Sequence, residues 1–156
     1  MAIFAIIATF GTLSFAATTA TTAYAQTTVQ NTVTILGVCG LTPDPTAIDY
    51  GQLLPDQVSS EQTLGISNTG NTQSSVSVMG TPWGNTNPPA MLVGATHYSL
   101  QSESYDDKEV LTDSNAALTT VNAQDTVFTF WQVKTTLNNP AAIGPQTQFV
   151  TLTGTC

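Results

Sequence analysis

The chain contains two cysteines, and their positions predict a long-range disulfide. Cys39 follows the run TTVQNTVTILGV, and Cys156 ends the run TQFVTLTGT. Side chains of an extended strand alternate between its two faces, and each cysteine falls on a face that also carries Val, Ile or Leu. We therefore expect both sulfur atoms to point inward and to join the first strand to the last. An intermolecular bridge and two free thiols are the alternatives.

The sequence offers little material for catalysis. His97 is its only histidine, and it contains no Gly-x-Ser-x-Gly elbow, phosphate loop or pair of zinc ligands. A nucleophile built from Cys39 and His97 would need a free, exposed thiol, which contradicts the expected disulfide. We therefore predict that the protein is not an enzyme and has no resident cofactor.

The run ESYDDKE concentrates acidic residues and is a weak candidate for calcium binding. Its carboxylates belong to Glu103, Asp106, Asp107 and Glu109. Calcium takes about six to eight oxygen ligands, and the ligand spacing of an EF-hand loop is absent. A solvated loop at the edge of the domain is the alternative, and no other metal site is expected.

Trp83 lies among loop-forming residues in TPWGNTNPP. An exposed indole on a rigid loop could stack on a sugar, which makes Trp83 a candidate for glycan binding. The alternative is that the ring plugs the open end of a β-sandwich, because a large aromatic ring buries much apolar surface.

The charge composition narrows the range of partners. Charged residues make up 8% of the chain, the only basic residues are Lys108 and Lys134, and the net charge is −8. Phosphate binding needs clustered Lys and Arg, so nucleic acid is not an expected partner. Anionic lipid headgroups are disfavoured for the same reason.

Residues 1–25 resemble a secretory leader that is removed from the mature protein. Ala2 to Ala17 form an apolar run, and Ala23-Tyr24-Ala25 is a small-x-small cleavage site before Gln26. No Lys or Arg precedes Ile3, which suggests that the natural start lies upstream. A retained anchor and a core helix are the alternatives. Cleavage would give a secreted domain over 26–156, without stable membrane insertion.

The mature region is predicted to be all-β. Short alternating runs are separated by Gly, Pro, Asn and Asp, which is typical of strands and turns. We expect seven to nine strands in two packed antiparallel sheets, with a closed barrel as the alternative. The first strand is expected over 28–38, a break over 41–46 (LTPDPT), and a hairpin turn over 67–73 (SNTGNTQ).

The run VFTFWQV is apolar on both faces of its predicted strand. Val127, Trp131 and Val133 share one face, whereas Phe128 and Phe130 share the other. A strand of a two-layer sandwich needs only one apolar face. The second face is therefore expected to be covered, by a loop of the same chain or by a neighbouring subunit.

The run 26–38 begins directly after the predicted cleavage site. Val29, Val33 and Ile35 fall on one face of it. It is either an ordinary first strand or a strand that joins the sheet of the next subunit, as in strand addition. In the second case these three residues, with Phe128 and Phe130, are the candidate subunit contacts.

Two long stretches resemble known exported proteins. IDYGQLLPDQVSSEQTLGISNTGNTQSSVSV is similar to the opening of secreted immunoglobulin-like modules, and FTFWQVKTTLNNPAAIGPQTQFVTLTGTC is similar to their closing hairpin. The layout resembles small secreted proteins of archaea and, more distantly, WxL-like and TasA/camelysin-like cell-surface proteins. This resemblance implies an immunoglobulin-like β-sandwich with a structural or adhesive role. A strict WxL signature is absent around Trp83 and Trp131, so peptidoglycan binding is not expected.

Together these patterns predict a secreted, cell-surface structural protein of archaeal type. It is expected to self-associate into a polymer or filament, with the run 26–38 as the strand that links subunits. The alternative is a monomeric extracellular binding module or adhesin, which would use Trp83 for glycan or the acidic run 103–109 for calcium.

Overall fold

The structure is a computed structural model that describes Gln30 and residues 32–84, 89–136 and 144–156. It divides the chain into two units, Met1–Thr34 and Ile35–Cys156. The described residues of the first unit form no helix or strand. The predicted leader over 1–25, its cleavage site and Val29 lie outside the described residues.

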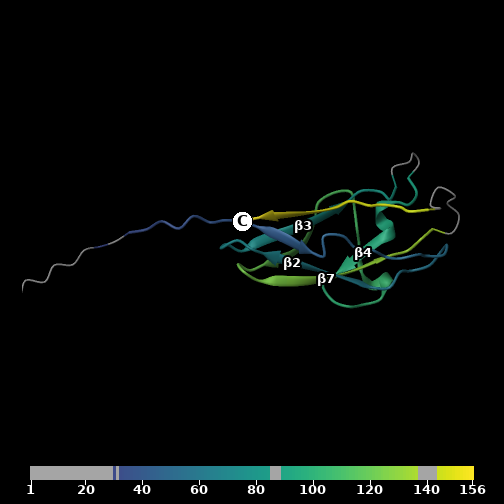
Figure 1. Cartoon of the computed structure of the whole chain (residues 1–156), viewed down its shortest axis with the longest axis horizontal. Helices are drawn as coiled ribbons and strands as arrows, with labels where there is room; N and C mark the ends of the chain where they lie inside the picture. The colour runs from purple at the N-terminus through teal and green to yellow at the C-terminus, as the bar shows by residue number, and fades with distance from the viewer. Residues whose placement is uncertain (1–29, 31, 85–88, 137–143) are drawn as a thin grey trace, which may run out of the picture. The chain divides into compact units, whose positions relative to one another are not determined.

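Two antiparallel sheets make up the second unit (Figure 1). In the described residues, the larger sheet has five strands in the order β1-β2-β7-β4-β5, and the smaller has three in the order β6-β3-β8. The strands of the larger sheet are β1 (Leu41–Asp44), β2 (Gln62–Asn68), β7 (Thr126–Val133), β4 (Thr96–Ser99) and β5 (Glu109–Val110). Those of the smaller sheet are β6 (Ala116–Val121), β3 (Ser74–Gly80) and β8 (Val150–Thr155). Two short 3-10 helices, η1 (Val93–Ala95) and η2 (Tyr105–Asp107), lie in the connections. The predicted all-β class is confirmed.

One core lies between the two sheets. Ile66 of β2, Val78 of β3 and Trp131 of β7 are at most 1% exposed, and they share a single cluster with Tyr98 of β4. The Tyr98 and Trp131 rings lie 5.3 Å apart between centroids. The period-two alternation of β2, β3 and β7 produces these inward faces, as the sequence predicts.

The start of the sheet differs from the prediction. No residue among 32–40 is in a strand, and the first described strand is β1 (LTPD), in the run where a break was expected. Pro43 of β1 pairs with Ile66 of β2. A proline cannot donate to a β-ladder and is tolerated only at an edge or a bulge. Among the strands that the structure describes, β1 is an edge strand that pairs with β2 alone, so its other side needs no donor.

The predicted hairpin over 67–73 is wrong as well. β2 pairs with β1 and β7, whereas β3 belongs to the other sheet. The turn residues therefore carry the chain from one sheet to the other. The buried Asn68 side chain stabilises this passage, because its amide donates to the carbonyls of Thr72 and Val121 and its oxygen accepts from the Gly70 N–H.

The disulfide between Cys39 and Cys156 is confirmed, with a Cα–Cα distance of 6.1 Å. Its expected inward orientation is wrong, since both cysteines are exposed. Cys39 lies in extended chain before β1, and Cys156 directly follows β8. The bridge therefore joins the two chain segments that flank the edge strands β1 and β8.

Removal of this disulfide should destabilise the domain strongly. The bridge spans a sequence separation of 117, for which the chain-entropy model gives about 5 kcal/mol, and measured losses for native bridges are about 2–5 kcal/mol. In urea unfolding, the double variant Cys39→Ser/Cys156→Ser should have a free energy of unfolding that is lower than that of wild type by a comparable amount. Reduced wild-type protein is the control and should behave like the variant. Equal stability of the oxidised, reduced and substituted proteins would contradict the expectation.

Candidate functional site

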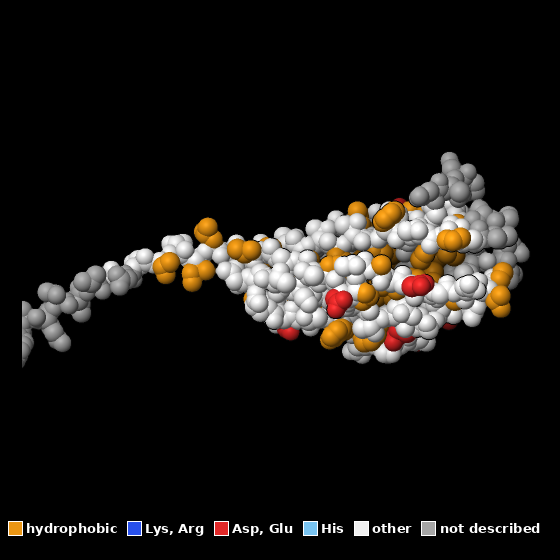
Figure 2. Space-filling model, viewed as in Figure 1, with side chains coloured by type: hydrophobic (Ala, Val, Ile, Leu, Met, Phe, Trp, Pro, Cys, Tyr) orange, Lys and Arg blue, Asp and Glu red, His pale blue; other side chains and the backbone are white. Residues whose placement is uncertain are grey.

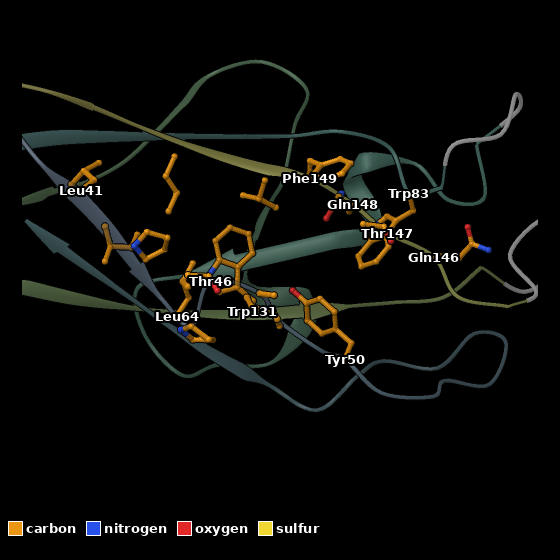
Figure 3. A pocket seen from close by; sticks show the side chains of 17 residues that line it. Leu41, Thr46, Tyr50, Leu64, Trp83, Trp131, Gln146, Thr147, Gln148 and Phe149 are labelled. Atoms are coloured by element: carbon orange, nitrogen blue, oxygen red, sulfur yellow. The ribbon is translucent and has the colours of Figure 1, made fainter.

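An apolar groove of about 510 Å³ opens between the two sheets along β1 and β8 (Figure 3). It is bounded on one side by β1 and the segment after it, and on the other by the segment that leads into β8. Its lining includes Leu41, Ile48, Tyr50, Trp131, Phe149 and Leu152. Its volume falls in the range of about 300–1,000 Å³ that is usual for ligand pockets.

On the side of the groove, the core residues between the two sheets are less completely buried than on the side of β6. Leu111 and Val121, which precede and end β6, are at most 1% exposed. Leu41 of β1 and Leu152 of β8 are only partly buried. At the disulfide end Leu41 lies directly over Gly154, where an added Cβ would come within 2.6 Å of the leucine Cδ1. The groove runs from this contact toward Tyr50.

Tyr50 brings a polar group into the groove. Its ring lies edge-on to Trp83 with centroids 6.0 Å apart, and Figure 3 shows its oxygen directed toward Trp131. Burial raises the pKa of the Tyr50 phenol. Among the described residues no group forms a hydrogen bond with this hydroxyl, so a donor on a partly buried side chain is available to a molecule in the groove.

Both strands that border the groove are edge strands. Within the described residues, β1 pairs only with β2, and β8 pairs only with β3. The free side of an edge strand presents backbone N–H and C=O groups that can pair with another chain. Pro43 and Pro45 remove donors from the β1 side, whereas β8 (VTLTGT) contains no proline. β8 is therefore the better template for an added strand.

Asn71 holds the chain just before Cys39 in an extended form. Its Oδ1 accepts from the Val38 N–H at 2.7 Å, its Nδ2 donates to the Leu36 carbonyl at 3.0 Å, and its own N–H donates to the Val38 carbonyl at 3.1 Å. Gly70 permits this approach, since an added Cβ would lie 2.0 Å from the Val38 oxygen. The Asn71 carboxamide thus makes the hydrogen bonds to the backbone of Leu36 and Val38 that a neighbouring β-strand would otherwise make.

The segment held by Asn71 exposes a row of aliphatic side chains. Ile35 is 79% exposed, Leu36 is 76% exposed and Val38 is 57% exposed. Elsewhere the face seen in Figure 2 is mostly uncharged and polar, with separate hydrophobic patches and a few acidic side chains. Val33 lies in the first unit, which the structure describes only in part. That Val29, Val33 and Ile35 contact another subunit stays a prediction.

Phe128 and Phe130 lie on the outer face of the five-stranded sheet, as predicted. Phe128 is 58% exposed and lies opposite Gly65, whereas Phe130 is partly buried opposite Thr63. Within the described parts of the chain nothing covers Phe128 fully. Full cover by a loop of the same chain is therefore not found in those parts, and cover by a neighbouring subunit stays a prediction.

The buried Lys108 organises the start of the acidic run. The buried Lys108 ammonium donates to the Glu61 carboxylate at 2.6 Å, to the Ser99 hydroxyl and to the Glu103 carbonyl at 2.8 Å. Hydrogen bonds from Lys108 and Ser102 hold the pKa of the Glu61 carboxyl below its usual value.

The four calcium candidates do not converge. Glu103 contributes its backbone carbonyl to Lys108, and Asp107 accepts from the Ser104 hydroxyl. Asp106 and Glu109 are exposed. In the part of the chain that the structure describes, no group of three or more His, Cys, Asp or Glu side chains could hold a metal ion.

His97 is engaged with η2. Its ring stacks on Tyr105 with centroids 3.9 Å apart, and its Nδ1 lies 2.8 Å from the Tyr105 carbonyl oxygen, so that this nitrogen carries the proton. The arrangement fixes the loop over 105–107 against β4. Cys39, which a catalytic pair would need, is in the disulfide.

Trp83 is buried rather than exposed on a loop. It is 8% exposed, packs with Met91 and Val133, and donates from its indole nitrogen to the Thr96 hydroxyl at 2.9 Å. A freely exposed ring for stacking on a sugar is therefore not found. The ring instead forms one end of the groove, beside Tyr50.

Comparisons with known proteins give no match. No family model, no curated protein and no solved structure matches this chain. Among the described residues, no helix is long and apolar enough to cross a membrane. The function must be argued from the groove, the edge strands and the exposed segment.

Replacing Glu61 should show how much the ion pair between Lys108 and Glu61 contributes to the free energy of unfolding. Removing one partner of a buried ion pair costs about 3–5 kcal/mol, and solvent at the 24% exposed Glu61 side chain should reduce this to about 2 kcal/mol. We expect Glu61→Gln to lower the free energy of unfolding by this amount at pH 7, and the exposed Glu109→Gln to change it little.

The same variant should alter the response to acid. Because the folded pKa of Glu61 is lowered, its stabilising effect is present above the usual value of 4.5 and is lost as the pH falls through the folded pKa. In urea unfolding between pH 7 and pH 2, the free energy of unfolding of Glu61→Gln should decrease less with falling pH than that of wild type. Parallel curves for the two proteins would show that the pair contributes nothing to acid stability.

Proposed function

We propose that this chain is an extracellular structural subunit that assembles by donating its N-terminal segment, residues 26–38, as a β-strand to another copy. The observation that carries the proposal is the exposure of Val33 and Ile35, which share one face of a segment whose base is fixed by Asn71 and by the disulfide. We also propose that the two-sheet fold is an immunoglobulin-like sandwich, on the resemblance of its two long stretches.

The exposed segment is costly for a protein that remains alone in water. Val33 and Ile35, which are 82% and 79% exposed, present apolar surface on the donor face that burial would stabilise by about 25 cal/mol per Å². Contiguous exposed apolar surface on a folded protein commonly marks an interaction site. The alternation of Val29, Val33 and Ile35 places these three on one face, which suits addition to a sheet edge.

The fixed base of the segment also supports assembly. Asn71 and Cys39 hold residues 36–39 in one conformation before any partner binds. A segment that is ordered in advance loses less conformational entropy on binding. The disulfide supports an oxidising compartment, and the scarcity of Lys and Arg argues against nucleic acid as a partner.

A monomeric extracellular binding module is the second candidate, and the groove favours it. Tyr50 offers a hydroxyl that no described residue engages, and Trp83 offers an aromatic wall, which is the combination of a few polar groups on an apolar lining that small-molecule sites use. Size-exclusion chromatography of the exported protein separates the two candidates. Concentration-dependent oligomers support assembly, whereas a monomer at all concentrations supports a binding module.

Charge placed on the apolar face of the segment should prevent assembly. In Val33→Asp/Ile35→Asp, two carboxylates would have to enter an apolar contact, so we expect monomers by size-exclusion chromatography and light scattering. The matched control is Thr32→Asp/Thr34→Asp, which adds the same charge to the opposite face and should still assemble. Equal assembly of both variants and wild type would refute donation of this segment.

A further inference from the structure

We propose that the groove between β1 and β8 is the acceptor for the N-terminal segment of a second copy, which would add as a strand to the free edge of β8. This inference rests on the proposed function, because it names the surface that receives the donated segment. Each molecule would then give one strand and receive one.

The lengths of the donor and the acceptor agree. β8 contains six residues and therefore offers about 20 Å of free edge at about 3.3 Å per residue. Alternation would place the donor residues Val29, Val33 and Ile35 on one face, and the seven residues 29–35 would span about 23 Å when extended. All three can therefore face the groove while the donor backbone follows β8.

The groove and the donor are both uncharged. None of the seventeen groove-lining residues is charged, and the segment TTVQNTVTILGV contains no charged residue either. In a chain of net charge −8 this matters, because two copies repel each other and burial of an unpaired charge would be costly. The contact we propose joins the two neutral regions.

The polar groups of the groove suit a peptide. The free edge of β8 can exchange N–H and C=O bonds with an added strand. The Tyr50 hydroxyl, which no described residue engages, can donate to a carbonyl of the donor. Leu41, Ile48 and Leu152, which are only partly buried in a single molecule, would then complete the core against the donor side chains.

The donor must come from a second molecule. Residues 36–38 are held extended by Asn71, and Cys39 is tied to Cys156 at one end of the groove. For the segment to enter its own groove, the chain would have to reverse within these residues and break the bonds to Asn71. Donation to another copy keeps every one of these bonds. Because donor and acceptor are different surfaces, the contact can repeat from copy to copy.

A groove-filling variant tests this inference. Ala47 is exposed and lines the groove, so Ala47→Trp should occupy the acceptor without entering the core. The matched control Ala117→Trp places the same ring at an exposed position of β6, away from the groove. We expect Ala47→Trp to be monomeric and Ala117→Trp to assemble like wild type.

Mixing two defective variants sharpens the test. Ala47→Trp can donate but not accept, whereas Val33→Asp/Ile35→Asp can accept but not donate. An equimolar mixture should form a one-to-one dimer and nothing larger by light scattering. If Ala47→Trp is folded by circular dichroism and still assembles like wild type, the groove is not the acceptor, although strand donation stands. If wild type itself never assembles, the proposed function fails first.

Cross-linking locates the contact independently of the groove-filling variants. A photo-crosslinking residue at position 33, in a mixture of isotopically labelled and unlabelled protein, should join mixed-label peptides that contain residues 41–50 or 146–152. Cross-links only within one labelled chain would show that the segment occupies its own groove. Mixed-label cross-links elsewhere would place the acceptor on another surface. Either result would overturn the inference.

Discussion

In the part of the domain that the structure describes, a sheet of three strands packs on the inner face of a sheet of five, and this difference determines where the core closes. On the side of β6 the cover is complete, so that Leu111 and Val121 are fully buried. On the side of β1 and β8 the sheets end as two unpaired edges with an apolar groove between them. The groove is therefore a product of the strand count and order rather than of any single side chain.

The loop between β2 and β3 connects the two parts of the proposed assembly. Asn68 points into the domain and stabilises the passage from one sheet to the other, whereas Asn71 points outward and holds the chain before Cys39. Two asparagines of the run NTGN thus perform different tasks with the same carboxamide group. Gly70 between them allows the chain to approach closely.

Local alternation allowed a correct prediction of the inward faces of β2, β3 and β7, because burial at period two leaves a direct mark on the sequence. Other features depend on pairing between distant residues. The run 67–73 has the composition of a hairpin turn, but composition does not determine which sheet the next strand joins. β1 was not predicted because its proline is acceptable only in an edge strand, and which strand lies at the edge depends on the complete strand order. The groove was not predicted either, because it lies between two edge strands and so depends on the same strand order.

The exposed disulfide has a mechanical consequence. Tension applied to the N-terminal segment reaches Cys39, and from there it divides between β1 along the chain and the end of β8 through the sulfur bridge. These strands belong to different sheets, so the load is shared by both layers instead of peeling β1 from its edge. Cys39 and Cys156 thus place a covalent junction at the point where a pull on the molecule would enter it.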